Sequence, residues 1–179
     1  MTLSNRRINA TLIAILCFVF AACAKPAADT NKAVSAGNNE PPRIASTDVV
    51  KATPEELTLA KGESGYAIVR LQIQSGYHVN ANPPSFPYLK ATELELTPAS
   101  GVSVEFVSYP DALTKKFSFS EEPLKVYEGD TTVKAMLKAA QSAETGRHNL
   151  SAKLRVQACD DQVCYPPGVM DLTVPVTIK

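Results

Sequence analysis

The sequence contains no tryptophan, only two histidines and no excess of charge of either sign. Its 18 basic and 18 acidic residues cancel, so it has no surplus positive charge to neutralise phosphates, and we expect no nucleic-acid partner. A glycine-rich phosphate loop and the GxGxxG, HExxH and GxSxG motifs are absent, which removes the usual signatures of nucleotide-binding proteins, zinc proteases and α/β-hydrolases. The 179 residues suit one domain.

The first 22 residues have the pattern of an export signal. Arg6 and Arg7 precede an apolar stretch from Thr11 to Ala22, which is shorter than the roughly 20 apolar residues that a membrane span needs. The stretch ends in small residues, as a cleavage site does. We therefore expect residues 1–22 to be a signal peptide, and the alternative is an uncleaved membrane anchor.

Two cleavage sites overlap at Cys23. The residues Phe20-Ala21-Ala22-Cys23 resemble the lipobox of bacterial lipoproteins, with Phe20 where leucine is usual. Alternatively, cleavage after the A-x-A sequence at residues 22–24 would release a soluble protein that begins at Lys25. We favour lipidation of Cys23, which would hold the protein on a membrane. By resemblance to lipoprotein sorting rules, Ala24 rather than aspartate after the cysteine allows transfer to the outer membrane.

The segment from residue 23 to residue 45 is rich in Ala, Asn, Pro, Lys and Ser and has almost no large apolar side chain. Such a segment cannot bury enough surface to offset the entropy lost on ordering. We expect it to be a flexible tether, which would connect the membrane to a domain formed by residues 46–179.

From residue 46 onward, short runs alternate between apolar and polar side chains, which is the period of a β-strand. The runs cover residues 66–73, 91–96, 102–106, 131–137, 150–158 and 172–178, and turn residues separate them. Only residues 134–143 offer a short helix as an alternative. Seven to nine strands of this kind predict an all-β, immunoglobulin-like antiparallel β-sandwich of two sheets.

The candidate chemistry lies in one loop, at Cys159 and Cys164. In an extended strand the Cα atoms of these residues would lie about 16 Å apart, whereas a disulfide needs roughly 4.4–6.8 Å. A bridge therefore requires a turn between them, for which Asp160-Asp161 is suitable. The segment would be a strand that ends at Cys159, a tight loop, and an exit stiffened by the prolines that follow Tyr165.

Three roles for this cysteine pair are compatible with its spacing. An exported protein permits a structural disulfide, although a bridge that closes about six residues stabilises a fold by only about 2 kcal/mol. A reversible redox dithiol is the second role. The third is a metal site in which His78 and His148 complete a Cys₂His₂ set, but neither histidine has the spacing of a zinc ligand. We expect no metal and no organic cofactor.

The acidic residues between the cysteines bear on reactivity. Negative charge beside a thiol disfavours the thiolate and raises the thiol pKa. Asp160 and Asp161 therefore predict cysteines that are weak free nucleophiles at neutral pH and that exchange with particular partners.

The motif from Val156 to Pro167, VQACDDQVCYPP, resembles the N-terminal periplasmic domain of the thiol:disulfide interchange protein DsbD. Supporting segments occur in the family's order at residues 76–80 (GYHVN), 117–119 (FSF) and 124–129 (LKVYEG). The resemblance extends over roughly residues 45–179. It implies an immunoglobulin-like fold and a redox-active pair of cysteines.

The resemblance also implies roles for individual residues. Cys164 would form the mixed disulfide with partner proteins, and Cys159 would resolve it. A loop at about residues 111–122 would cap the pair, with Phe117 lying over it and Phe119 as the alternative. His78 and Asn80 would lie beside the site.

The family's domain relays electrons from a membrane-linked, thioredoxin-like domain to oxidised periplasmic proteins, including disulfide isomerases and cytochrome c maturation factors. These 179 residues contain no counterpart of the family's transmembrane segment or of its thioredoxin-like domain. The resemblance therefore implies a separate electron donor. The alternative function is a non-catalytic, immunoglobulin-like binding module in which the disulfide only holds a loop.

Overall fold

The computed structural model describes residues 44–179, in which there are twelve β-strands and no helix. The predicted all-β class is therefore confirmed. Over this part of the chain, no helix is long and apolar enough to cross a membrane. The predicted signal peptide, the lipidation candidate Cys23 and residues 23–43 of the predicted tether lie outside the described residues.

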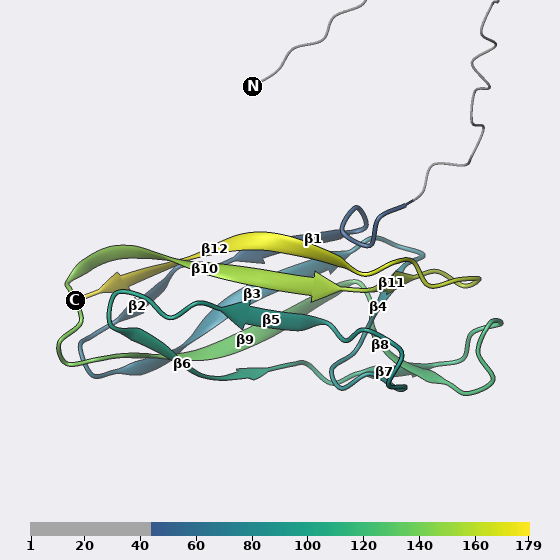
Figure 1. The fold of residues 1–179 in the computed structure, drawn as a ribbon, viewed down its shortest axis with the longest axis horizontal. Helices are drawn as coiled ribbons and strands as arrows, with labels where there is room; N and C mark the ends of the chain where they lie inside the picture. The colour runs from purple at the N-terminus through teal and green to yellow at the C-terminus, as the bar shows by residue number, and fades with distance from the viewer. Residues whose placement is uncertain (1–43) are drawn as a thin grey trace, which may run out of the picture. The chain divides into compact units, whose positions relative to one another are not determined.

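Two four-stranded sheets form an immunoglobulin-like sandwich (Figure 1). Neighbouring strands are antiparallel, apart from β2, which pairs parallel with β12. The first sheet has the order β1 (Val50–Pro54), β3 (Ser64–Ile73), β9 (Asp130–Ala139), β6 (Val102–Ser108). The second has the order β2 (Leu57–Leu59), β12 (Gly168–Ile178), β10 (Gly146–Val156), β5 (Glu93–Leu96).

The core lies between these two sheets and follows the alternation of the sequence. Over most of each long strand, every second residue is apolar and buried or half-buried, while the residues between them are mostly polar and more exposed. The buried set includes Val69 and Leu71 of β3, Leu150 and Leu154 of β10, and Val176 of β12. Burial of these side chains is the main term that stabilises the sandwich.

A third sheet of four short strands was not predicted. Its order is β11 (Ala158–Cys159), β4 (His78–Asn80), β8 (Leu124–Tyr127), β7 (Leu113–Lys115), and all its pairs are antiparallel. It lies at the end of the sandwich away from the C-terminus (Figure 1). Its strands have only two to four residues, so they show no clear alternation. For this reason the predicted number of strands, seven to nine, was too low.

Two details of the prediction change in the structure. The alternative of a helix at residues 134–143 is wrong, because β9 continues as a strand to Ala139. The predicted strand at residues 150–158 is interrupted at Gln157, where the chain leaves β10 and enters β11. This step carries the chain from the second sheet into the third, and it places Cys159 beside β4.

Candidate functional site

Cys159 and Cys164 form a disulfide across a tight hairpin, with their Cα atoms 3.9 Å apart. The amide of Asp160 donates to the carbonyl oxygen of Val163 at 3.0 Å, and the amide of Tyr165 donates to that of Ala158 at 2.8 Å. The strand does end at Cys159, and the chain reverses at once, as a bridge between cysteines at this spacing requires.

Asp160 holds the turn of this hairpin together. One carboxylate oxygen accepts hydrogen bonds from the amides of Gln162 and Val163, both at 2.8 Å, and the other accepts from the Tyr165 hydroxyl at 2.5 Å. The bond from Tyr165 is the main reason that the pKa of Asp160 is lowered, and the same bond raises the pKa of Tyr165 to about 12. At neutral pH, Asp160 is therefore a fixed negative charge between the two cysteines.

The two sulfur-bearing residues differ in exposure. Cys159 is fully buried, whereas Cys164 is partly exposed and lines a groove of about 600 Å³. A disulfide is opened by in-line attack of a thiolate on one of its sulfurs. Of the two residues, Cys164 is therefore the more accessible to such an attack.

The groove beside Cys164 has an apolar wall and an acidic rim. Tyr88, Phe119 and Val163 line it and are 71%, 39% and 49% exposed. Exposed apolar groups gathered in one place are typical of a surface that another protein covers. Glu121 and Glu122 add negative charge along the same groove.

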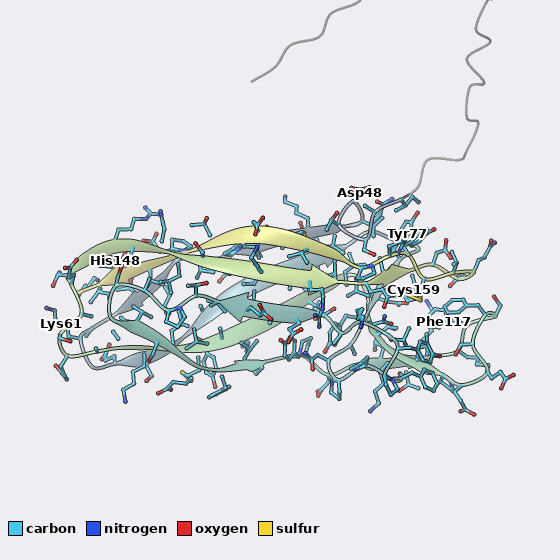
Figure 2. The ribbon with its side chains drawn as sticks, viewed as in Figure 1. Asp48, Lys61, Tyr77, Phe117, His148 and Cys159 are labelled. Atoms are coloured by element: carbon cyan, nitrogen blue, oxygen red, sulfur yellow. A yellow bond between two sulfur atoms is a disulfide. The ribbon has the colours of Figure 1, made fainter. Side chains whose placement is uncertain are left out.

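The strand β4 lies directly beside the disulfide. In the ladder between β11 and β4, Cys159 is opposite His78, and Ala158 is opposite Val79. Figure 2 labels Cys159 together with Tyr77 and Phe117 at this end of the molecule, and His148 at the opposite end. His78 is therefore brought to the cysteines, and His148 is not.

His78 is buried, and its surroundings keep it neutral. Its ring stacks on Phe117 with the centroids 4.1 Å apart, and neither ring nitrogen has a hydrogen-bond partner within the described residues. Burial is the main reason that its pKa is lowered, and the positive charge of Lys115 adds to the effect. Nδ1 lies 3.9 Å from a carboxylate oxygen of Glu128, too far for a hydrogen bond.

The segment after β7 covers this region. Phe117 is only 3% exposed, and the more exposed Phe119 stacks on it with a centroid distance of 5.4 Å. The hydroxyl of Ser118 donates to the carbonyl oxygen of Asp161 at 2.7 Å, which ties the segment to the cysteine hairpin. The Lys115 ammonium lies 5.5 Å from the centroid of the Phe117 ring.

Asn80 is buried one position beyond Val79, and it acts through a residue that the sequence analysis did not single out. Its side-chain amide donates to the Gln157 side chain at 3.0 Å. Gln157 in turn donates to the carbonyl oxygen of Tyr165 at 3.2 Å and accepts from the amide of Lys90 at 2.7 Å. Gln157 therefore links the end of the hairpin at Tyr165 to Asn80 of β4 and to the backbone at Lys90.

Ser46 is a second residue that the sequence analysis missed. It is fully buried, accepts a hydrogen bond from the Ala158 amide at 2.9 Å and donates to the carbonyl oxygen of Pro166 at 2.6 Å. One hydroxyl thus ties the two flanks of the cysteine hairpin together. No local sequence signal identifies it, because its partners lie 112 and 120 residues away.

The arrangement does not favour the zinc alternative. Cys159 and Cys164 are bonded to each other, and His148 instead contacts the carbonyl oxygen of Glu144 through Nε2 at 2.8 Å. Over residues 44–179, no group of three or more His, Cys, Asp or Glu side chains is placed to hold a metal ion.

The sequence model of the family described as "Thiol:disulfide interchange protein DsbD, N-terminal" matches residues 47–174. Among solved structures, the reduced N-terminal domain of DsbD from Neisseria meningitidis is 18% identical with a TM-score of 0.48, and the alignment covers 75% of this chain and 90% of that one. The N-terminal periplasmic domain of ScsB from Proteus mirabilis is 16% identical with a TM-score of 0.47, with coverages of 72% and 45%. No curated protein sequence matches this chain.

Proposed function

Since the chain belongs to the family of DsbD N-terminal domains, we propose that it carries out thiol–disulfide exchange by cycling between a Cys159–Cys164 disulfide and a dithiol. The observation that carries this proposal is the bonded cysteine pair, in which one residue is buried and the other borders an open groove. Such a pair can be opened from one side only.

The exchange has two steps. In the first, the Cys164 thiolate attacks a partner disulfide, forms a mixed disulfide and releases one partner thiolate. In the second, the Cys159 thiolate attacks the Cys164 sulfur, which re-forms the internal disulfide and releases the second partner thiolate. The partner gains two electrons and two protons, and the domain loses them. The difference in exposure between the cysteines supports this order, since an outside disulfide reaches Cys164 first.

The reverse of this reaction reduces the disulfide and returns the domain to its dithiol form. We propose that the dithiol is restored by a membrane-linked, thioredoxin-like electron donor. The oxidised partners would be periplasmic proteins such as disulfide isomerases and cytochrome c maturation factors. The apolar groove with Glu121 and Glu122 on its rim supports a partner surface that is apolar around its cysteine and basic at its edge.

The segment that carries Phe117 is the proposed cap. Phe117 is buried against His78, and Ser118 is bonded to the hairpin, so the segment has contacts on both sides of the disulfide. A cap of this kind would slow small oxidants and reductants, while a partner that displaces the segment would gain access. Phe119 lines the groove and is more exposed than Phe117, which favours Phe117 as the covering ring.

We propose that the domain works in the periplasm and that a lipid on Cys23 holds it at a membrane, with the outer membrane favoured. A tether would raise the local concentration of the domain near membrane-bound partners. Mass spectrometry of the mature N-terminus tests this: acylated Cys23 supports the anchor, and a free N-terminal Lys25 contradicts it.

The central test is the redox equilibrium of Cys159 and Cys164 in a glutathione series, measured by thiol alkylation and mass. We expect the pair to open and close reversibly with the β-sheet circular dichroism signal unchanged. With Cys159→Ser, a mixed disulfide on Cys164 should accumulate, whereas with Cys164→Ser the buried Cys159 should trap little partner. A bridge that opens only when the domain unfolds would contradict the proposal and favour the binding module with a structural disulfide.

A further inference from the structure

His78 is a buried, ionisable side chain for which the exchange described above has no use. Its exposed fraction is 0%, and both of its ring nitrogens are without hydrogen-bond partners among residues 44–179. Burying unpaired polar atoms costs free energy, so a side chain in this state needs an explanation. An apolar ring of similar size would fill the space beneath Phe117 at lower cost.

The position of His78 relative to Cys159 supplies an explanation for this unpaired, buried side chain. The two residues are directly opposite each other in the antiparallel ladder of β4 and β11. Side chains of such pairs point to the same face of the sheet, with their Cβ atoms about 4.5–5.5 Å apart. The imidazole of His78 and the sulfur of Cys159 therefore belong to neighbouring side chains on the same face of this sheet. In the disulfide this sulfur has no proton to share, whereas in the dithiol it does.

We propose that His78 is the base that accepts the proton of the Cys159 thiol when the mixed disulfide on Cys164 is resolved. This inference rests on the proposed function. The imidazole takes the thiol proton, the resulting thiolate attacks the Cys164 sulfur, and the bond between Cys164 and the partner breaks. The partner leaves as a thiolate, and the imidazolium gives its proton to that thiolate or to solvent, so that His78 returns to its neutral form.

Two observations support a base at this place. Cys159 is fully buried beside the negative charge of Asp160, and both conditions disfavour its thiolate. Water cannot remove the proton easily, because Phe117 covers the imidazole and is itself only 3% exposed. A neutral imidazole on the opposite strand is a proton acceptor at this place, and the lowered pKa of His78 keeps it unprotonated at neutral pH.

The charged groups around His78 come from three elements. Lys115 of β7 lowers its pKa, while Glu128 after β8 and Asp160 and Asp161 of the hairpin raise it, and burial outweighs them. The resolving step should therefore slow down only below the ordinary pKa of histidine. Above that pH its rate should be constant, instead of rising with thiol ionisation at about pH 8.5.

The test uses the full chain with Cys17→Ser and Cys23→Ser, so that Cys159 and Cys164 are its only thiols. Reduced protein is mixed with 5,5′-dithiobis(2-nitrobenzoate), and thionitrobenzoate release is followed from pH 5 to pH 9. The first equivalent reports attack by Cys164, and the second reports resolution by Cys159. We expect His78→Gln to slow the second phase about 100-fold at neutral pH and to leave the first within twofold.

The matched control is His148→Gln, which makes the same substitution at the far end of the molecule (Figure 2) and should leave both phases unchanged. The pH profile of the parent protein is a test that needs no variant at His78. A second phase that rises steadily to pH 9, or a normal second phase in His78→Gln, overturns the role of His78 alone. A disulfide that cannot be reduced without unfolding overturns the proposed function as well.

Discussion

The rings of His78 and Phe117 stack with their centroids 4.1 Å apart and their planes inclined by 23°. Phe117 belongs to the segment that follows β7, whereas His78 belongs to β4 and pairs with Cys159. The contact thus joins the proposed cap to the strand that flanks the disulfide. Substituting either ring should therefore change the behaviour of the cysteines, although neither residue is a cysteine neighbour in sequence.

Phe117→Ala should open the cap and keep the sandwich folded. Removing a buried phenyl ring costs about 3–5 kcal/mol in a well-packed core, but Phe117 packs in a small cluster separate from the main core. We expect oxidation of the reduced domain by glutathione disulfide to become roughly tenfold faster, measured by alkylation of quenched samples. Phe106→Ala is the control, since Phe106 is 50% exposed on β6. Equal oxidation rates in Phe117→Ala and the parent would remove the cap from the proposed function.

His78 should make the stability of the domain sensitive to mild acid. Its pKa is lowered by burial in the folded state, so the folded domain binds its proton less readily than the unfolded chain does. The stabilisation is complete above the ordinary histidine pKa and is lost as the pH falls towards the lowered one, by at most about 1.4 kcal/mol per pH unit. Urea unfolding of the parent and of His78→Gln from pH 8 to pH 5 measures this. Parallel pH dependences would show that His78 does not titrate in this way.

Asp160→Ala should shift the redox equilibrium towards the dithiol. The substitution removes three hydrogen bonds that hold the turn, and it removes a negative charge that disfavours the thiolates. Both effects favour the open form, and we expect about a fivefold change in the glutathione equilibrium constant. Asp160→Asn separates the loss of charge from the loss of hydrogen bonds, because asparagine is neutral but keeps an acceptor oxygen for the turn.

Asp161→Ala is the matched control for this prediction. The side chain of Asp161 is exposed, and the bond from Ser118 is to its backbone carbonyl. Its substitution should therefore change the equilibrium less than that of Asp160. An equal shift in the two variants would mean that overall charge, and not the turn, controls the potential.

Tyr88→Ala should weaken exchange with protein partners selectively. Tyr88 is 71% exposed and stacks on Phe86 at 5.3 Å between centroids, so its loss should change stability by less than about 0.5 kcal/mol. We expect the rate of mixed-disulfide formation with a thioredoxin-like protein to fall about tenfold and the rate with glutathione to stay the same. Tyr66→Ala, at a 45% exposed position on β3, should change neither. Equal losses with both reagents would exclude the groove as a docking surface.

The sandwich could be predicted because its long strands each bury one face. In β3, β10 and β12 the apolar residues recur at every second position and the buried residues follow them. The third sheet could not be predicted in this way. All three residues of β4 are buried, because the strand lies between the proposed cap and the sandwich, so its sequence shows no alternation.

The turn of the candidate site could be predicted, because its causes lie within a few residues of sequence. The turn between Cys159 and Cys164 follows from their spacing and from the aspartate at its start, and the disulfide is present. Gln157 and Ser46 were missed because their roles depend on contacts across 77 and 112 residues of sequence. Serine and glutamine carry no signal for such contacts, and only the folded chain reveals them.

The single hydroxyl of Ser46 has a mechanical consequence. It bonds to Ala158 before the cysteines and to Pro166 after them, and it lies on the N-terminal side of β1. A pulling force on the N-terminal side of the domain would therefore act on the hydrogen bonds that hold the two flanks of the cysteine hairpin together. A shortened version that begins after Ser46 would therefore lose the hydroxyl that holds the two flanks of the cysteine hairpin together.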